Sequence, residues 1–393
     1  SLPLRREAWR GEAVVAVFEN LLPDNPDVRR QVAEKTGAAG VDAYSLLEQI
    51  GRDCIGAMQF LPEGEAPGDM SRIEGEPLEE ADIALMLANL ARAPLGIDLE
   101  KDFRISIAGA QEKTALLRHE GRWLRPIGAT PTTHILKPQL GEIPTASGVI
   151  DLTNSVENEH YCLMVLEECG LPVARTEIAD FAGRRVLVVE RFDRRRRRDE
   201  GLLRLPQEDF CQALSVPSSR KYQDRQGPSA VDIMGRLKES DAPLVDLAAF
   251  FKSQVLFWLI GATDGHAKNF SLFLRPGGRF ELTPFYDVLT AQPAFDAGRI
   301  PHKAYRLAMS VGRSRHYRIL DIHGRHFVET GLEAGLGPTI IRRVLDELRE
   351  EAAPALEHAR ARMPAGFHDE IHDAVARAVA ARLPRLETAD PLL

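Results

Sequence analysis

Apolar residues along the first part of the chain recur at spacings of three and four, which is the pattern of short amphipathic helices. The pattern predicts helices over residues 13–23, 42–51 and 78–91. Segments rich in proline and glycine separate them, for example LPEGEAPGD at residues 61–69. We therefore expect residues 1–97 to form a helical N-terminal subdomain.

The pattern changes near Phe103, where runs of β-branched and aliphatic residues predict strands. The predicted strands are FRISIAG, KTALLRH, THILKPQ, PVARTEIADF and RRVLVVERFD. One helical stretch, residues 155–170, interrupts them. Strands with one inserted helix predict a small α+β lobe over residues 98–193.

The rest of the chain returns to helical spacing. Helices are predicted at residues 206–214, 229–238 and 244–261, followed by two long helices between about Pro338 and Leu383. Pro354 should kink or split the first of these two, because proline cannot donate the hydrogen bond of a helix interior. We expect a mostly helical lobe over residues 206–393, and hence a bilobal α+β fold.

An arginine run, residues 194–198, stands between the two predicted lobes. We interpret residues 194–205 as a solvated basic linker, since runs of like charge usually lie in water. Contact of the arginines with a phosphate-bearing partner is the alternative interpretation.

Composition narrows the class of protein. The 393 residues are 44% hydrophobic, so the chain can bury a sizeable core, and the net charge of −8 argues against general affinity for nucleic acid. The four cysteines show no metal-binding spacing, which indicates a reducing compartment. The apolar run at residues 255–262 is too short to span a bilayer, and we expect a cytoplasmic protein without a membrane partner.

Polar residues cluster directly after the predicted helix 244–261, in the segment DGHAKN. Asp264 and Asn269 are five residues apart, and protein kinases use an aspartate and an asparagine at this spacing to orient the attacking hydroxyl and to bind magnesium. Asp287, in LTPFYDV, stands where a kinase places its second metal-binding aspartate. Alone, the spacing is common, and a turn-capping Asp264 with Asn269 bonded to buried backbone is the structural alternative.

The neighbours of these residues extend the predicted site. Lys268 is expected to neutralise the transferring phosphoryl group, and His266 to brace the loop. Tyr286, in the aromatic pair before Asp287, is grouped with the nucleotide-binding residues.

The strand lobe supplies a lysine and a glutamate. Lys137 ends the strand THILK, from which a lysine can reach the α- and β-phosphates of a nucleotide, although an exposed strand-end lysine is the simpler alternative. Glu159 shares a helix face with Cys162 and Leu166 and should point inward. An inward glutamate needs a cationic partner, and Lys137 is the natural one.

Two backbone segments complete the predicted nucleotide site. A turn of small residues after Ser106 is expected to hold phosphates through its N–H groups, although it matches neither GxGxxG nor a Walker A loop. The residues of this turn are Ala108, Gly109, Ala110, Gln111, Glu112 and Lys113. The backbone of Glu190, Arg191 and Phe192 is expected to hydrogen-bond an adenine edge. Together with Lys137, Glu159, Asp264, Asn269 and Asp287, these parts follow the chain order of a bilobal kinase.

These segments resemble the HipA family of serine/threonine toxin kinases over nearly the whole chain. The resemblance is carried by FRISIAGAQEKTALL, PTTHILK, ERFDR, LRLPQEDFCQAL, IGATDGHAKNFS and LTPFYD. It implies a kinase-like fold, ATP with Mg²⁺, and autophosphorylation at Ser106. It also implies that Asp264 is the catalytic aspartate and that Asn269 and Asp287 bind the metal.

The resemblance further implies partners. A small HipB-like helix-turn-helix antitoxin would neutralise the kinase and carry it to operator DNA, so that the complex associates with the nucleoid. The protein substrate would be an aminoacyl-tRNA synthetase, with glutamyl-tRNA synthetase the leading candidate. Members of the family usually begin with a strand-rich segment before the point where this chain starts, so we expect an incomplete N-terminal subdomain.

Two other functions are compatible with the same residues. A small-molecule or lipid kinase shares the bilobal plan, because two aspartates and an asparagine do not distinguish a protein hydroxyl from another alcohol. A kinase-like corepressor that acts mainly through its antitoxin would be favoured by loss of Lys137, Asp264 or Asp287, and all three are present.

Overall fold

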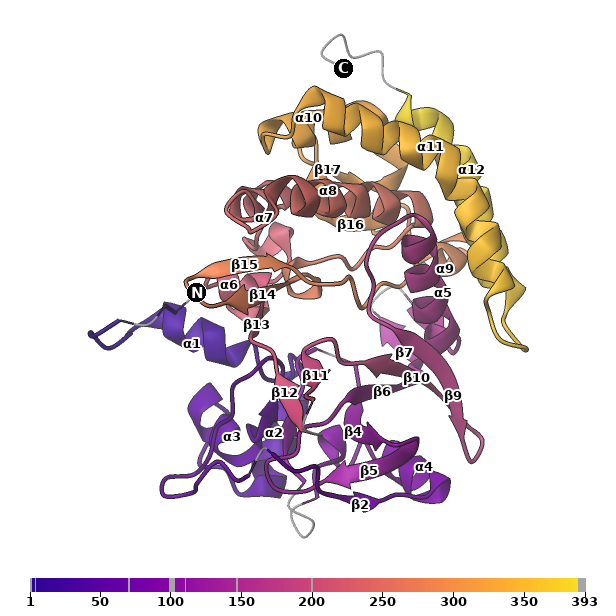
Figure 1. The fold of residues 1–393 in the computed structure, drawn as a ribbon. Helices are drawn as coiled ribbons and strands as arrows, with labels where there is room; N and C mark the ends of the chain where they lie inside the picture. Colours follow the sequence, from indigo (N-terminus) through magenta and orange to yellow (C-terminus); the bar gives the residue numbers. More distant parts are fainter. Residues whose placement is uncertain are drawn as a thin grey trace. The chain divides into compact units, whose positions relative to one another are not determined.

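The computed structural model describes residues 2–3, 5–69, 71–98, 103–109, 111–145, 148–198 and 201–387. The chain forms two compact units that alternate along the sequence (Figure 1). The first unit contains residues 1–139, 174–219 and 273–278, and the second contains residues 140–173, 220–272 and 279–393. The division into segments 1–97, 98–193, 194–205 and 206–393 stays a prediction.

Four helices begin the first unit, and three of them confirm the predicted helices. They are α1 (Glu12–Glu19), α2 (Pro26–Thr36), α3 (Ala43–Ile50) and α4 (Glu80–Ala88). Helix α2 was not predicted from the sequence. Only Val32 and Ala33 of its eleven residues are buried, so its sequence shows little apolar periodicity. Its ends are nevertheless well defined, since the Asn25 side chain caps the first turn and Gly37 ends the helix with a left-handed backbone.

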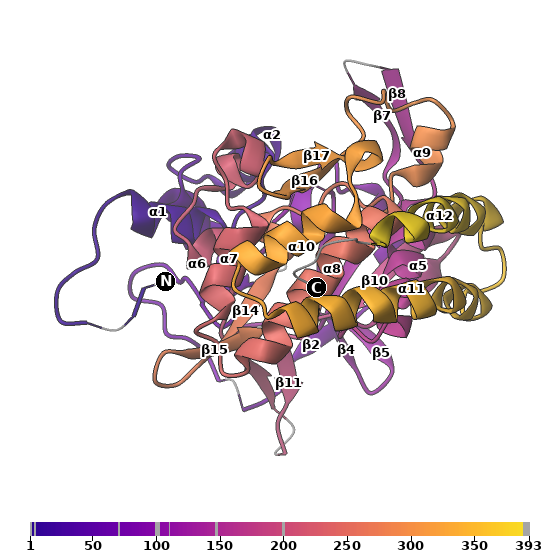
Figure 2. The same cartoon turned by 90° about the horizontal axis from the view of Figure 1, so that it is seen from above.

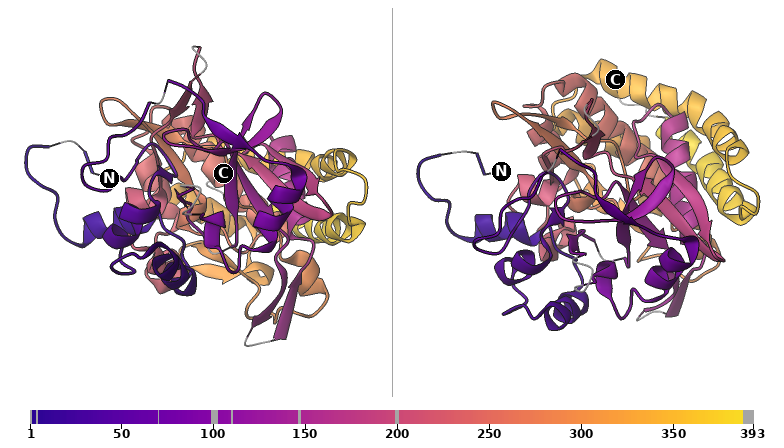
Figure 3. Two further views of the ribbon diagram at one scale, coloured as in Figure 1. Left: turned by 90° about the horizontal axis from the view of Figure 1, so that it is seen from below. Right: turned by 60° about the horizontal axis from the view of Figure 1, so that its bottom comes forward.

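A six-stranded antiparallel sheet forms the other half of the first unit (Figure 3). Its spatial order is β2 (Gly75–Pro77), β5 (Arg122–Pro126), β4 (Thr114–His119), β6 (His134–Pro138), β10 (Arg184–Glu190) and β9 (Thr176–Phe181). Leu116, Leu136 and Val188 of this sheet share one buried core with Leu46 and Ile83 of the helices. Four of the five predicted strands therefore lie in this sheet as β4, β6, β9 and β10, while β2 and β5 were not predicted, and the sheet packs against the N-terminal helices.

Shorter elements complete the first unit. Strand β3 (Ile105–Ser106) pairs in parallel with β1 (Asp53–Cys54), and β11 (Arg194–Arg196) pairs with β12 (Leu202–Arg204). The helix predicted at residues 206–214 is a strand, β13 (Gln207–Asp209), followed by the single turn α6 (Phe210–Ala213). The Asp209 side chain caps that turn, and this cap explains why the helix begins there.

The second unit is mostly helical (Figure 2). Its helices are α5 (Ser155–Glu168), α7 (Ala230–Leu237), α8 (Pro243–Ile260), α9 (Gln292–Asp296), α10 (Gly324–Glu333), α11 (Pro338–Ala361) and α12 (Asp369–Arg382). Its strands are β7 (Gly141–Thr145), β8 (Gly148–Leu152), β15 (Arg279–Leu282), β16 (Arg306–Val311) and β17 (His316–Arg318), while β14 (Ser271–Arg275) has residues in both units.

Two of these helices differ from the sequence interpretation. Helix α5 interrupts the predicted strand lobe in the sequence, but it packs against α8 and α11 of the second unit. Its residues from Ser155 to Leu166 are buried on every side. Helix α11 continues through Pro354 and is not split.

Helix α8 is the core helix of the second unit. It is long and apolar enough to cross a membrane by length and composition, yet 72% of that stretch is buried inside the protein. Trp258, Leu259 and Ile260 at its C-terminal end are almost completely buried. Burial on all sides is what an apolar helix in the middle of a domain requires.

A cluster of buried charges in the first unit overturns part of the linker interpretation. Arg194 lies in the arginine run that was expected to be solvated, yet its side chain is only 2% exposed. Its Nη2 lies 2.9 Å from Asp53 Oδ1 and its Nη1 lies 3.0 Å from Asp193 Oδ2. Arg191 bonds the same two aspartates at 3.2 and 2.8 Å, and Arg204 lies 3.3 Å from Asp53. Only the rest of the run, residues 195–198, is exposed.

These ion pairs set the charge state of Asp53. Burial raises the pKa of the Asp53 carboxyl, but Arg194, Arg191 and Arg204 outweigh burial and hold this pKa well below its usual range. Asp53 therefore stays ionised and offsets the buried arginines. Its contribution to stability is present above the unfolded-state pKa of about 4 and is lost as the pH falls through the lower folded-state pKa.

Asp53→Asn should destabilise the protein by about 3–5 kcal/mol at neutral pH, because it leaves three buried guanidinium groups short of a counter-charge. Urea unfolding measures this loss, and the difference from the wild type should shrink below about pH 4, because there the Asp53 carboxyl of the unfolded wild-type chain binds a proton while that of the folded protein stays ionised. Asp27→Asn is the control: Asp27 pairs with Arg30 at the surface, so the change should cost less than about 1 kcal/mol. Equal effects of the two substitutions would contradict a structural role for the cluster.

Candidate active site

The predicted catalytic loop begins where helix α8 ends. Gly261 ends the helix in the left-handed region, with φ of 74°, and the Ala262 N–H donates to the Phe257 carbonyl at 2.8 Å. A Cβ on Gly261 would lie 2.1 Å from the Tyr305 hydroxyl oxygen. Both the backbone conformation and the available space therefore require glycine at this turn.

Asp264 has a fixed backbone and an accessible carboxylate. Its carbonyl accepts hydrogen bonds from the His266 N–H and from Asn269 Nδ2, each at 2.8 Å. Its side chain is 62% exposed, and Oδ1 accepts a hydrogen bond from the Tyr222 hydroxyl at 2.6 Å. A held but exposed carboxylate is what a residue that orients an incoming hydroxyl needs.

Asn269 connects the two predicted catalytic segments. Its Nδ2 donates to the carbonyl of Asp264 and also lies 3.5 Å from the carbonyl of Asp287. These contacts fix the amide, so its oxygen points away from both carbonyls. Asp287 has a φ of 59°, which is unusual for a residue other than glycine and is typical of constrained functional positions.

The donor set in this unit fits magnesium. The Asp287 carboxylate and the Asn269 amide oxygen are hard oxygen donors, and Mg²⁺ is usually held by one or two protein carboxylates together with substrate phosphates and water. Within the described ranges, no three His, Cys, Asp or Glu side chains form a metal cluster.

The other predicted loop residues are mostly buried. The His266 ring is buried and meets the Tyr222 ring edge-on at 4.9 Å. Lys268 is buried, and its carbonyl accepts a hydrogen bond from the Tyr286 hydroxyl at 2.8 Å. Tyr286 and Ser271 also share a hydrogen bond at 2.6 Å. The contact of His266 with Tyr222 is compatible with the predicted role of His266 in supporting the loop. The predicted contacts of Lys268 and Tyr286 with a nucleotide stay predictions.

Sequence reasoning missed two residues that position this loop. Tyr222 is 42 residues before Asp264, in a segment without periodicity, so no local signal marks it. Asn158, in α5, exchanges two hydrogen bonds with the Thr290 backbone at 2.8 and 2.9 Å. A polar residue in the middle of a buried helix was the available signal for Asn158.

The predicted phosphate loop lies in the first unit, where it is fastened to the chain after α1. Ser106 is fully buried, and its hydroxyl donates to the Leu21 carbonyl at 2.8 Å. The Gly109 carbonyl accepts a hydrogen bond from the Asp24 N–H at 3.1 Å. Ala110 lies outside the described residues.

The remaining loop residues fold back on the loop and on β6. Lys113 Nζ donates to the Ala108 carbonyl at 2.9 Å, and Gln111 Nε2 donates to the Pro138 carbonyl at 3.2 Å. A Cβ on Gly109, which has a φ of 113°, would lie 2.4 Å from Lys113 Nζ. The turn is therefore compact around the lysine, and Glu112 is exposed.

Lys137 and Glu159 are both buried, which excludes the alternative of an exposed strand-end lysine. Lys137 belongs to β6 in the first unit, opposite Leu187, and Glu159 belongs to α5 in the second. Glu159 points inward as predicted, but the helix is buried on all faces, so periodicity alone did not establish this. Their ion pair stays a prediction.

The predicted adenine-binding backbone ends strand β10. The N–H groups of Glu190 and Arg191 donate to the carbonyls of Arg175 and Thr133, both at 2.9 Å. These two N–H groups are therefore already hydrogen-bonded within the protein. The Arg191 side chain belongs to the buried ion cluster. The Phe192 ring meets Phe273 edge-on at 5.7 Å. A contact of this backbone with adenine stays a prediction.

Known proteins similar to this chain cover nearly its whole length. Residues 105–356 match the family model of the HipA-like C-terminal domain, and residues 1–61 match that of the HipA N-terminal domain. The Sinorhizobium fredii protein named Putative kinase Y4mE is 32% identical over 360 residues, which cover 91% of this chain and 81% of that protein. The serine/threonine-protein kinase toxin HipA of Shewanella oneidensis is 28% identical over 386 residues, which cover 90% and 84%.

A solved structure agrees with the fold. A chain in the complex of the Shewanella oneidensis toxin–antitoxin system HipA, HipB and operator DNA has a TM-score of 0.78 and 22% identity. The match covers 95% of this chain and 86% of that one. The predicted bilobal, kinase-like α+β fold is therefore confirmed.

Gly261→Ala should destabilise the protein by about 2–4 kcal/mol, since alanine meets both an unfavourable backbone conformation and the Tyr305 hydroxyl. Gly298→Ala is a matched control in the same unit: its φ is 71°, but a Cβ there would meet nothing within 4 Å. The control should lose only about 1 kcal/mol. Denaturant unfolding of the two variants measures the difference, and equal losses would show that space at Gly261 is not limiting.

Proposed function

The chain belongs to the HipA family of kinases, and from this premise we propose that it is the serine/threonine kinase toxin of a HipA–HipB-like module. It transfers the γ-phosphoryl group of ATP to a protein hydroxyl. One observation carries the proposal: Asp264, Asn269 and Asp287 lie together in one unit, with the Asp264 carboxylate held by Tyr222 and exposed.

In the proposed reaction, Asp264 orients the substrate hydroxyl and receives its proton. The hydroxyl oxygen forms a bond to the γ-phosphorus, the bond from that phosphorus to the β,γ-bridging oxygen breaks, and ADP leaves. Asn269 and Asp287 would hold Mg²⁺, which neutralises phosphate charge when it is bound. Tyr222 keeps the Asp264 carboxylate in one orientation through its hydrogen bond.

Most of the proposed nucleotide-binding residues belong to the first unit, and the others, which are His266, Lys268, Asn269 and Tyr286, belong to the second. Lys137 binds phosphate oxygens, and the backbone of residues 108–113 donates to the phosphates. The backbone of residues 190–192 binds adenine through groups other than the Glu190 and Arg191 N–H groups, which are bonded within the protein. Burial of Lys137 supports its role, because a partly desolvated ammonium group interacts more strongly with phosphate than one in water.

Ser106 is the proposed site of autophosphorylation. Its hydroxyl is buried and bonded to Leu21, and its strand pairs with Cys54. Strand β3 must therefore leave β1 before Ser106 can accept a phosphoryl group. A phosphoserine of about −1.5 to −2 charge cannot return to that dry position, so the phosphate loop stays displaced and ATP binds more weakly.

The partners follow from the family. The Shewanella structure contains HipA with HipB and operator DNA, and we propose a HipB-like antitoxin as the partner of this chain, with operator DNA bound through it. The net charge of −8 supports this indirect route to DNA. An aminoacyl-tRNA synthetase, with glutamyl-tRNA synthetase first, is the proposed substrate, and both partners place the chain in the cytoplasm.

Asp264→Asn should abolish phosphoryl transfer and leave ATP binding largely intact, because other residues bind the nucleotide. Asp287→Asn should instead weaken magnesium-dependent ATP binding. Transfer from labelled ATP and nucleotide titration calorimetry measure the two effects. Asp346→Asn, an exposed aspartate on α11, is the control and should change neither. If Asp264→Asn kept most of the wild-type rate, the assignment of the catalytic loop would be wrong.

Incubation with Mg-ATP should raise the intact mass of the protein by one phosphate, mapped to Ser106, and ATP affinity should then fall. Ser106→Ala and Asp264→Asn should both remain unmodified. Ser71, which is exposed, should stay unmodified in every variant. An unmodified Ser106 in active enzyme would contradict autophosphorylation at this serine. Full ATP affinity of the phosphorylated form would contradict the proposed displacement of the phosphate loop.

A further inference from the structure

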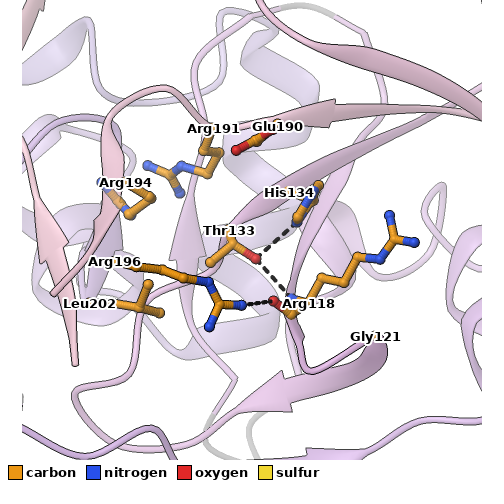
Figure 4. Close-up of a pocket in the computed structure, with 9 residues that line it drawn as sticks. All are labelled: Arg118, Gly121, Thr133, His134, Glu190, Arg191, Arg194, Arg196 and Leu202. Atoms are coloured by element: carbon orange, nitrogen blue, oxygen red, sulfur yellow. Dashed lines mark hydrogen bonds between the residues drawn. The ribbon is translucent and has the colours of Figure 1, made fainter. Parts of the chain in front are cut away.

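A cavity of about 330 Å³ opens in the first unit, beside the ends of strands β4, β6 and β10 and the β11–β12 hairpin (Figure 4). Nine residues line it, and the argument below uses Arg118, Thr133, His134, Glu190 and Arg196. Its volume is in the range that accepts a small molecule.

The cavity lies on the face of the sheet opposite Lys137. His134 and Glu190 are directly paired across β6 and β10, as are Lys137 and Leu187. Side chains three residues apart in one strand point to opposite faces. His134 and Glu190 therefore share the cavity face, and Lys137 belongs to the other. The cavity is distinct from the proposed phosphate site.

The positive charge available in the cavity comes from Arg196 of β11. Arg196 contacts His119 Nδ1 at 3.1 Å and the Arg118 carbonyl at 3.4 Å, and it has no carboxylate partner among the described residues. Figure 4 shows its guanidinium group reaching toward the backbone of Arg118. Arg118 also lines the cavity, but Glu177 pairs with it at 2.6 Å. The Glu190 carboxylate lines the cavity as well, and it lies 3.9 Å from Arg175. Arg191 and Arg194 also line the cavity, but Asp53 and Asp193 already neutralise them.

A neutral histidine adds a third polar group. The Thr133 hydroxyl bonds His134 Nδ1 at 2.9 Å and also accepts the Arg118 N–H at 2.8 Å, which leaves Nε2 as the ring nitrogen for a ligand. Burial, together with the charges of Arg118 and Arg196, lowers the pKa of His134 to about 4. At neutral pH this ring is therefore uncharged, and it can offer a ligand a hydrogen bond but no positive charge.

We propose that this cavity binds a small phosphate-bearing ligand, held by Arg196 and by His134 Nε2. The two groups come from different strands, β11 and β6. A tetrahedral phosphate offers acceptors in several directions and up to two charges, whereas a carboxylate offers two oxygens in one plane.

Inorganic phosphate is the probe, titrated while a non-hydrolysable ATP analogue saturates the nucleotide site. Binding is followed by the NMR signals of the His134 ring in protein with isotope-labelled histidine. Arg196→Gln should weaken phosphate binding about tenfold or more, which is the loss expected for one charge-assisted hydrogen bond. Acetate should bind about tenfold more weakly than phosphate.

Arg195→Gln is the matched control. It removes the same charge from the neighbouring position of β11, which points to the other face of the strand and does not line the cavity. This variant should bind phosphate within about twofold of the wild type, because only screened surface charge is lost. Equal weakening by both variants, no saturable change at His134, or equal binding of acetate would overturn the proposal.

Discussion

The proposed catalytic chemistry depends on the C-terminal end of α8, a buried helix that is rich in aromatic residues. Helix α8 is buried to its last residue, so its final carbonyls must be satisfied within the protein. The Ile260 carbonyl accepts the Thr290 hydroxyl at 2.5 Å, and the Gly261 carbonyl accepts the Ala291 N–H at 2.9 Å. The same helix end therefore fixes the loop that carries Asp264 and the segment that follows Asp287.

This constraint explains why so many polar groups stand at that point in the sequence. A turn at the end of a buried helix has several unpaired backbone groups, and Asn269 and Thr290 bond to two of them. Asn158 in turn bonds the backbone of Thr290. Once bonded, these side chains also hold Asp264 and Asp287 at fixed positions. Asn269 does bond to buried backbone, which was the structural alternative for this residue. That bond uses its amide nitrogen, so the amide oxygen is left for the proposed metal.

The phosphate loop depends on a different set of contacts. Ser106 bonds Leu21, and Gly109 bonds Asp24, so the segment between α1 and α2 holds the loop. Cys54, the strand partner of Ser106, follows Asp53 of the buried ion cluster. The segment that joins the first two N-terminal helices therefore positions the loop that we propose to bind phosphate.

Sequence reasoning found what local patterns encode. Strands such as β10 and the helix α8 follow from periodicity, and the chain order of Lys137, Asp264 and Asp287 indicated a kinase. It missed Tyr222 because a contact across 42 residues has no periodic signature. It misjudged Arg194 because a buried arginine is indistinguishable in sequence from a solvated one until Asp53 and Asp193 are seen beside it.

The most direct test of the central claim is to identify what the chain phosphorylates. Purified protein is incubated with γ-labelled ATP, magnesium and either glutamyl-tRNA synthetase or a lysate that retains its small molecules and lipids, with Asp264→Asn as the inactive control. We predict label on serine or threonine of a protein, with a synthetase the principal labelled species. Label that appears only in sugars or lipids, or label on protein that persists with the Asp264→Asn variant, would contradict the account.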